Sequence, residues 1–288
     1  MSPIRQRQMR VHHVESDLEN HDRGLDYDLP RLIGRRGLLT LAIGAGAATV
    51  AGCSVAAQTG SAGASPTSPA STASSTGSDV DLEQIPEETA GPYPGDGSNG
   101  VNVLDDSGIV RSDITTSFDT STTRADGVPL SITMTILDES IGDAPLSGAA
   151  VYLWDCNIDG QYSMYSRSIS QENYLRGVQQ TDASGQVTFA SVFPAAYDGR
   201  WPHIHFEVYP SLAQATSSIN KIATSQMALP EEACQTVYAT SGYEQSSRNL
   251  SQTSLDRDNV FGDGYDLQIP TVSGSVTNGL TLEFACSV

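Results

Sequence analysis

The alternation of apolar and polar residues constrains the fold of this sequence most strongly. In residues 130–136, Leu-Ser-Ile-Thr-Met-Thr-Ile, every second side chain is apolar. Successive side chains of a strand point to opposite faces, so this run predicts a strand with one buried face. Residues 149–154 and 204–209 are similarly rich in β-branched and aromatic residues, and an Asp/Ser/Gly turn at 182–185 precedes another alternating run. Residues 231–243 predict one short helix and 259–268 a loop.

These patterns predict an all-β fold, a β-sandwich with long loops and little helix, and no internal repeat is found. The 26 glycines and 14 prolines argue against a helical bundle. The chain carries 34 acidic residues against 15 lysines and arginines, which excludes a phosphate-facing nucleic-acid surface.

The first 53 residues differ in charge from the rest of the chain. Arg35 and Arg36 stand before an uncharged run from Leu38 to Gly52, which is shorter than the ~20 apolar residues that span a bilayer. This arrangement resembles a twin-arginine export signal, and Val50-Ala51-Gly52-Cys53 resembles the bacterial lipobox. Residues 1–53 are therefore expected to be a lipoprotein signal, with Cys53 lipidated and the protein anchored on the outer face of a bacterial cytoplasmic membrane. An ordinary cleavage site with an incidental cysteine is the alternative.

A tether and one folded domain are expected after the signal. Residues 54–78 are almost entirely Ala, Gly, Ser, Thr and Pro, a composition with too little apolar surface to fold. Segment 54–79 is therefore expected to be a flexible tether that reaches roughly 25–30 Å. Residues 80–288 have the size of one β-sandwich domain.

Two histidines mark the candidate site of this domain. His203 and His205 stand two residues apart in a predicted strand, so both imidazoles would project from one face toward a common metal ion. The spacing alone fits equally well with two histidines on a solvated strand face.

Neighbouring motifs favour the metal interpretation. They occur in order along the chain and together resemble the intradiol ring-cleavage dioxygenases from about Gln84 to the C-terminal region. The matching pieces are Gly91-Pro92-Tyr93, Arg111-Ser112-Asp113-Ile114, Gly127-Val128-Pro129-Leu130, Gly148-Ala149-Ala150-Val151, Gly160-Gln161-Tyr162-Ser163, Leu175-Arg176-Gly177-Val178-Gln179, Tyr197, Arg200, Pro202-His203-Ile204-His205-Phe206 and Thr224-Ser225-Gln226.

The resemblance implies one non-haem Fe(III) per chain, held by Tyr162, Tyr197, His203 and His205. Phenolate oxygen is a hard anionic donor that suits ferric iron, and imidazole suits iron generally. The implied reaction cleaves a catechol-type ring with O2 to a cis,cis-muconate-type product and incorporates both oxygen atoms. Tyr197 is the tyrosinate that substrate would displace, and it would then accept a catechol proton.

Three further residues receive roles from the resemblance. Arg200 corresponds to an arginine that stabilises negative charge on the reacting substrate, with a surface salt bridge as the alternative. Gln226 corresponds to a glutamine near the substrate, and Tyr93 would line the mouth of the pocket. Ala90 replaces the family's usual glutamate before Gly-Pro-Tyr, a departure in the N-terminal part of the site.

The other cysteines and acidic residues have simpler interpretations. With Cys53 lipidated, Cys156 is expected to be a buried small hydrophobe, and Cys234 and Cys286 are expected to form a disulfide outside the cell. The four aspartates between 256 and 266 lack calcium-loop spacing and indicate turns.

Two other functions remain open from the sequence. One is a non-catalytic tethered β-sandwich that binds aromatic or carbohydrate ligands, and the other is a zinc hydrolase built on the His-x-His pair. A hydrolase would need a third His, Cys or carboxylate ligand, and Tyr162 and Tyr197 are poor substitutes. The sequence leaves the identity of the catechol and the oligomeric state open.

Overall fold

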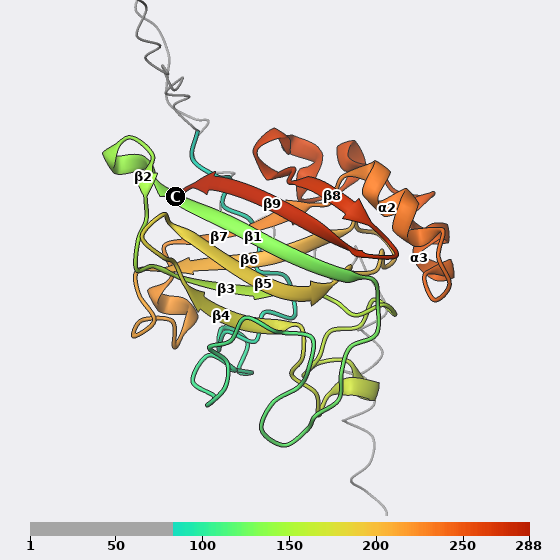
Figure 1. The fold of residues 1–288 in the computed structure, drawn as a ribbon, viewed down its shortest axis with the longest axis horizontal. Coiled ribbons are helices and arrows are strands. Elements are labelled where there is room, and N and C mark those ends of the chain that lie inside the picture. Colours follow the sequence, from blue (N-terminus) through green and yellow to red (C-terminus); the bar gives the residue numbers. More distant parts are fainter. Residues whose placement is uncertain (1–82) are drawn as a thin grey trace, which may run out of the picture. The chain divides into compact units, whose positions relative to one another are not determined.

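The structure is a computed structural model that describes residues 83–288 (Figure 1). The predicted signal 1–53 with its Cys53, the predicted tether 54–79 and the predicted domain boundary after residue 79 lie outside these residues. No helix in the described part of the chain is long and apolar enough to cross a membrane. The strands are β1 (Pro129–Asp138), β2 (Ala144–Pro145), β3 (Ala150–Trp154), β4 (Arg176–Gln180), β5 (Gln186–Val192), β6 (His203–Tyr209), β7 (Ala223–Ala228), β8 (Thr271–Ser275) and β9 (Gly279–Ser287).

Two sheets pack face to face, as the alternating sequence predicts. One sheet has the order β2-β1-β9-β8, with β5 also pairing with β1, and the other has the order β4-β3-β6-β7. The all-β sandwich is confirmed. The sequence did not reveal the C-terminal hairpin, in which β9 lies parallel to β1 although about 150 residues separate them in the chain.

The main core fills the space between the sheets. In β1 the apolar members of the alternation, Leu130, Ile132, Met134 and Ile136, are buried, while the residues between them are half-buried. They pack in one cluster with Ile204, Phe206 and Val208 of β6, among other residues. Every second side chain of β1 and of β6 therefore lies in the core between the sheets, as the alternating sequence predicts.

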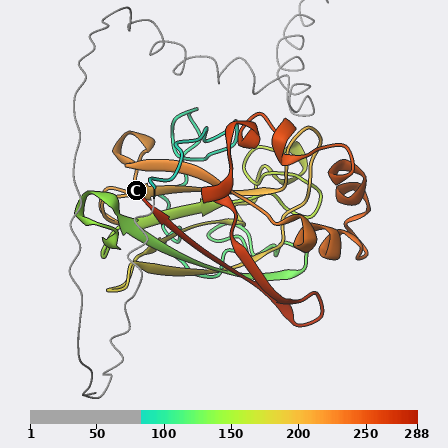
Figure 2. The same cartoon turned by 90° about the horizontal axis from the view of Figure 1, so that it is seen from above.

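The second sheet is buried on its other face as well. All residues of β3 and β6 are buried, and a second apolar cluster joins Tyr152 and Trp154 of β3 to Val103 and Leu104 of the N-terminal segment. Figure 2 shows much of this segment, in teal, beyond the second sheet. Loops thus cover a face that carries polar as well as apolar side chains.

Two short helices follow β7. The predicted helix over 231–243 is α2 (Glu231–Tyr238), and α3 (Glu244–Leu250) follows after a brief turn. Tyr243, between them, donates a hydrogen bond to the Phe193 carbonyl at 2.7 Å and accepts one from Val128 N–H at 3.1 Å. These bonds fix the helical segment beside the start of β1 and the end of β5.

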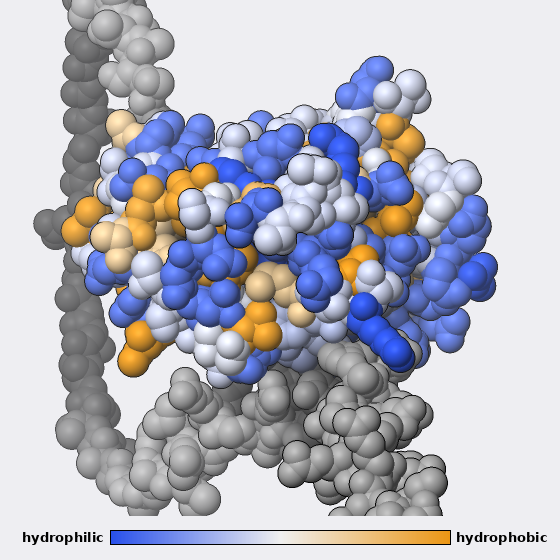
Figure 3. All heavy atoms as spheres, turned by 90° about the horizontal axis from the view of Figure 1, so that it is seen from below, coloured by the Kyte–Doolittle hydropathy of each residue, from blue (hydrophilic) through white to orange (hydrophobic). Residues whose placement is uncertain are grey.

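The outer surface is largely hydrophilic on the face that Figure 3 shows, with scattered apolar patches. The large apolar side chains that stand out into solvent in the described part of the chain are Val110, Ile141, Ile219 and Ile222. Isolated apolar residues of this kind are normal on soluble domains.

The expected disulfide between Cys234 and Cys286 is wrong. Both residues, and Cys156, are buried free thiols. The Cys234 thiol lies 3.9 Å from the Leu229 carbonyl, to which it donates, and Cys286 occupies a core position of β9 opposite Ile136. Burial raises the pKa of Cys286 to about 12, so these cysteines act as apolar core residues rather than reactive thiolates.

Asp155, at the end of β3, should make stability pH-dependent. It is buried, its Oδ2 accepts a hydrogen bond from Ser191 at 3.1 Å, and its Oδ1 has no partner, so burial raises its pKa well above 3.8. The folded state then holds this proton more tightly than the unfolded state, and stability falls as pH rises above 3.8. The unfolding free energy of Asp155→Asn should therefore rise relative to that of wild type as pH increases. The difference should grow by at most about 1.4 kcal/mol per pH unit, as measured by urea titrations at several pH values.

Asp182→Asn is the matched control with the opposite sign. Hydrogen bonds from Gln186 and Ser184 lower the pKa of this exposed turn carboxylate. The carboxylate therefore stabilises the folded wild-type protein more as pH rises, and Asp182→Asn should lose that stabilisation. A stability difference for Asp155→Asn that does not vary with pH would contradict the assignment of a protonated buried Asp155.

Candidate metal centre and active site

Strand β6 holds both histidines on the loop-covered face of the second sheet. His203 and His205 point away from the main core, while Ile204 and Phe206 point into it, as the period of two predicts. His205 lies opposite Trp154 of β3 and Gln226 of β7 in the sheet register. The indole of Trp154 stacks on the His205 ring with centroids 4.8 Å apart and planes at 6°. Trp154 therefore fixes the orientation of that imidazole as well as filling the core.

The fold brings together the four side chains that the sequence singles out as metal ligands. His203 Nε2 lies 3.1 Å from His205 Nε2 and 3.1 Å from the Tyr197 hydroxyl. The Tyr162 ring packs edge-on against both Tyr197 and His205, with centroids 6.0 and 6.1 Å apart. Two imidazole nitrogens and two phenol rings thus meet at one place.

The protonation of these groups fits a metal ion. His203 Nδ1 donates to the Trp201 carbonyl at 2.5 Å, which leaves the Nε2 lone pair facing the centre. Burial, reinforced by the charge of Arg200, lowers the pKa of His203 to about 3, and burial likewise lowers the pKa of His205 well below 6.5. Both rings are therefore neutral and able to ligate.

Two buried polar atoms at the centre have no hydrogen-bond partner. They are the Tyr162 hydroxyl and His205 Nδ1. Burial raises the pKa of Tyr162 well above 10, so this phenol would ionise only beside a strong positive charge. An unpartnered buried hydroxyl beside two neutral imidazoles is what a metal centre with oxygen and nitrogen donors requires.

Tyrosines are essential to any metal centre here. Residues 83–288 contain no group of three or more His, Cys, Asp or Glu side chains that could hold a metal ion. The histidine pair therefore lacks the third ligand of a zinc hydrolase, and the phenol oxygens complete a donor set suited to ferric iron.

A tight loop after β3 positions Tyr162. Asn157 Oδ1 accepts hydrogen bonds from the N–H groups of Asp159 and Gln161, and the Ser166 hydroxyl accepts one from Tyr162 N–H. Gly160 has a φ of +75°, which the turn requires, and a Cβ there would lie 3.0 Å from Tyr197 Cβ. The absence of a side chain at Gly160 lets the Tyr162 loop pack closely against Tyr197.

Arg200 is buried beside the centre and held at two points. Its Nε donates to Asp258 Oδ2 at 2.9 Å and its Nη2 donates to Gln226 Oε1 at 2.8 Å. Gln226 in turn donates through Nε2 to the Thr89 carbonyl at 2.9 Å. Gln226 thus lies at the site as the sequence suggested, with its amide engaged in holding Arg200 and the N-terminal segment. Arg200 does form a salt bridge, with Asp258, but this salt bridge is buried and is not the surface salt bridge of the alternative interpretation.

Asp258 is the member of this group that sequence reasoning missed. Its position in an Asp/Gly-rich stretch gave only a turn signal, and nothing in the sequence connects it with Arg200. The contact arises because the chain returns after α3 to the residues just before β6.

The N-terminal segment reaches the centre through Tyr93 and Gly91. The ring centroid of Tyr93 lies 5.0 Å from that of Tyr162 and 5.3 Å from that of Tyr165. Gly91 has a φ of +70°, and a Cβ there would lie 3.3 Å from His205 Cε1. Ala90, the departure from the family pattern, is therefore in a segment that contacts the site.

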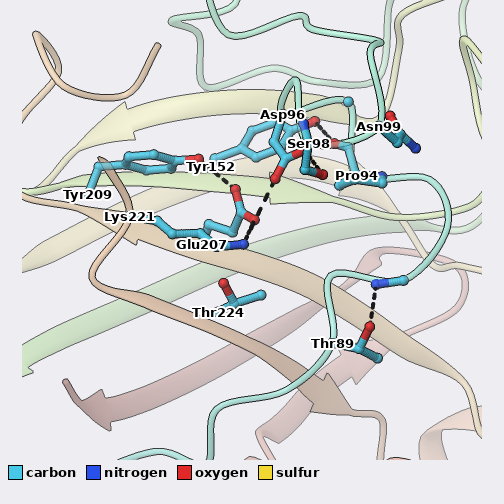
Figure 4. A network of polar contacts seen from close by, with 12 residues as sticks. Thr89, Pro94, Asp96, Ser98, Asn99, Tyr152, Glu207, Tyr209, Lys221 and Thr224 are labelled. Atoms are coloured by element: carbon cyan, nitrogen blue, oxygen red, sulfur yellow. Dashed lines mark hydrogen bonds and ion pairs between the residues drawn. The ribbon is translucent and has the colours of Figure 1, made fainter. Parts of the chain in front are cut away.

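A buried polar network continues the same face of β6 beyond the histidines (Figure 4). Glu207 accepts hydrogen bonds from Lys221 at 2.8 Å and from Tyr209 at 2.6 Å, and Asp96 lies 3.9 Å from Lys221. Burial, opposed by Lys221, raises the pKa of Glu207 to about 7. This network joins the N-terminal segment to β6 and the loop before β7.

Comparisons with known proteins show which families and folds this chain is similar to. Residues 109–231 match the family model described as Dioxygenase. The fold is similar to the solved intradiol ring-cleavage dioxygenase from Tetranychus urticae, with 25% identity and a TM-score of 0.56 over 71% of this chain and 94% of that one. In the matched family model and in its fold, the chain is similar to the intradiol ring-cleavage dioxygenases.

Two other solved structures are more distant. The 3-chlorocatechol 1,2-dioxygenase of Rhodococcus opacus 1CP is 14% identical, with a TM-score of 0.46 over 71% of this chain and 72% of that one. The catechol 1,2-dioxygenase of Pseudomonas arvilla C-1 is 18% identical, with a TM-score of 0.44 over 73% of this chain and 63% of that one. No curated protein matches this chain.

The Gly160 contact gives a test of the centre. Gly160→Ala should strain the left-handed backbone by about 1–2 kcal/mol and also push Tyr197 away from His203. Gly148→Ala is the control, because Gly148 has a φ of +85° and no atom within 4 Å of a Cβ there. Thermal unfolding should show similar losses of stability in both variants, whereas iron content after reconstitution should fall only for Gly160→Ala. Equal iron content in the two variants would contradict the proposed packing role.

Proposed function

We propose that this protein is an exported Fe(III) intradiol dioxygenase that opens a catechol-type ring with O2 to a cis,cis-muconate-type product. The observation that carries the proposal is the convergence of Tyr162, Tyr197, His203 and His205 beside the buried guanidinium of Arg200. These four side chains would hold one iron per chain. A non-catalytic binding module would gain nothing from neutral imidazoles and an unpartnered phenol arranged in this way.

Fe(III) held there would act as a Lewis acid that favours the ionised form of both catechol hydroxyls. The two tyrosines differ in burial: Tyr162 is 2% exposed, whereas Tyr197 is half-buried. Tyr197 is therefore the tyrosine with room to turn toward an incoming substrate. Its Oη, which would be a phenolate in the iron-loaded site, is the base we assign to accept a catechol proton. Tyr162 is the fixed ligand.

Arg200 is suited to stabilise charge on the reacting ring. It is 2% exposed, and Asp258 and Gln226 restrain its guanidinium on two sides. A cation fixed before reaction in a place shielded from water interacts strongly with developing negative charge and requires no reorganisation. The Phe261 ring, 5.8 Å from the Arg200 Cζ, adds an apolar wall. Tyr93 is proposed to contact substrate from the N-terminal side.

The decisive experiment compares variants of Tyr162 and Arg200. The purified domain should contain close to one iron per chain, show a visible tyrosinate-to-iron absorption band, and consume O2 with at least one member of a catechol panel. Tyr162→Phe should lose iron, colour and ring cleavage together. Arg200→Ala should keep iron and colour but lose ~10²–10³ in kcat, because it acts only on charge that develops in the substrate.

His203→Ala is the reference for ligand loss and should lower iron content, unlike Arg200→Ala. Full ring cleavage by an iron-free preparation would refute the proposal. Ligand binding without turnover in an iron-loaded preparation would favour the non-catalytic module instead.

Export and lipid anchoring form a separate part of the proposal. They are supported by Arg35-Arg36 and by Val50 to Cys53 in the sequence. Replacing both arginines with lysine should retain the precursor in the cytoplasm, and Cys53→Ala should prevent lipidation, both measured by fractionation and mass spectrometry of the bacterial host. Unmodified mature protein found only in the medium would refute the anchor. A tether of this composition would leave the domain free to rotate above the membrane.

A further inference from the structure

One carboxylate, that of Asp258, joins two parts of the site. Asp258 Oδ2 accepts hydrogen bonds from Arg200 Nε at 2.9 Å and from the Trp201 N–H at 2.6 Å. The two donors belong to consecutive residues just before β6. Their relative position is therefore fixed by a single oxygen atom.

The other oxygen of the same carboxylate binds different donors. Asp258 Oδ1 accepts hydrogen bonds from the N–H groups of Val260 at 2.9 Å and Phe261 at 3.2 Å. These bonds shape the turn that follows Asp258, as aspartates often do. Turn formation and contact with Arg200 thus use separate oxygens, so a substitution can affect one and retain the other.

The backbone of Trp201 extends the link to His203. Its N–H donates to Asp258, and its carbonyl accepts from His203 Nδ1 at 2.5 Å. Asp258 Oδ2 thereby holds both Arg200 and the backbone of Trp201, and Trp201 in turn holds the His203 ring. The arrangement fixes where the guanidinium stands relative to the imidazole.

The pair is deeply buried, with 2% of the Arg200 side chain and none of the Asp258 side chain exposed. Burial alone would raise the pKa of Asp258, but the charge of Arg200 and its hydrogen bonds hold that pKa below 3.8. A buried charge that loses its partner is strongly destabilising, so the guanidinium is confined to the geometry that Asp258 offers. Gln226 restrains the other side of the guanidinium without neutralising it.

We propose that Asp258 is a positioning residue that holds Arg200 in its working orientation beside His203, an inference that rests on the proposed function. Asp258 acts through Arg200 and contributes nothing to ring cleavage on its own. Its effect on turnover should therefore disappear when Arg200 is absent.

The test is a double-mutant cycle with Asp258→Asn and Arg200→Ala. Asparagine keeps an oxygen for the Val260 and Phe261 N–H groups but presents an NH2 to the donors of Arg200 and Trp201. Asp258→Asn alone should lower kcat by ~10–10²-fold, since a displacement of about 1 Å costs about that much. In the Arg200→Ala background the same change should alter kcat by less than about twofold.

Two readouts separate positioning from general damage. Iron content and the visible band should stay at wild-type levels in Asp258→Asn, because all four proposed ligands remain. Asp182→Asn is the matched control: Asp182 Oδ1 accepts N–H bonds from Ser184 and Gln186 in an exposed turn, and the variant should keep wild-type kcat. An equal fall in kcat for Asp258→Asn in both backgrounds, or loss of its iron, would overturn the proposal.

A rescue experiment covers the case in which Asp258→Asn does not fold. Arg200→Ala removes the buried cation, and millimolar guanidinium chloride should partly restore its kcat by occupying the space beside Asp258. The double variant leaves neither buried charge unpaired, and it should show no rescue. Equal rescue in both variants would refute the role of Asp258, with sodium chloride as the ionic-strength control.

Failure of this inference is distinguishable from failure of the proposed function. If wild type contains no iron and cleaves no catechol, the proposed function fails. If wild type is active and the cycle is additive, the proposed function stands and the role of Asp258 fails.

Discussion

The structure depends on the burial of both faces of strand β6. One face supplies Ile204, Phe206 and Val208 to the core between the sheets, and the other presents His203, His205 and Glu207 under loops. Polar groups on the loop-covered face are removed from water, so each needs a hydrogen bond, an opposite charge or a metal. This requirement explains the packing of the N-terminal segment, the loop after β3 and the segment after α3 around one strand.

Buried arginines meet this requirement in two ways. All five N–H donors of Arg176 are used, by Ser163, Tyr152, Tyr93 and Pro94, so it acts as a rigid connector between β4 and the N-terminal segment. Arg200 instead has a buried carboxylate partner and lies beside the candidate metal centre. Because neutral acceptors use every N–H donor of Arg176, this arginine has a structural role. Arg200 is instead paired with one carboxylate at the site, where its charge can stabilise negative charge on a substrate.

The free cysteines illustrate the same dependence on the core. The sequence suggested a bridge between Cys234 and Cys286 because exported proteins stabilise themselves in this way. Both side chains instead fill apolar positions between α2, β9 and the sheets, where a thiol is as useful as a small hydrophobe. The large two-sheet core makes a bridge unnecessary for burial.

The sequence by itself determined the features that depend on near neighbours in the chain. Period-two alternation fixes which side chains of β1 and β6 share a face, and the His-x-His spacing therefore put both imidazoles on one side. The resemblance of ordered motifs also identified Tyr162, Tyr197 and Arg200 as residues of one site. Only the tertiary structure decided how distant segments meet: that Trp154 stacks on His205, that Gln226 holds Arg200 and Thr89, and that β9 lies beside β1. Asp258 is the clearest case, since a local turn pattern is its entire sequence signal, whereas its contact with Arg200 spans 58 positions and exists only because the chain folds back onto the start of β6.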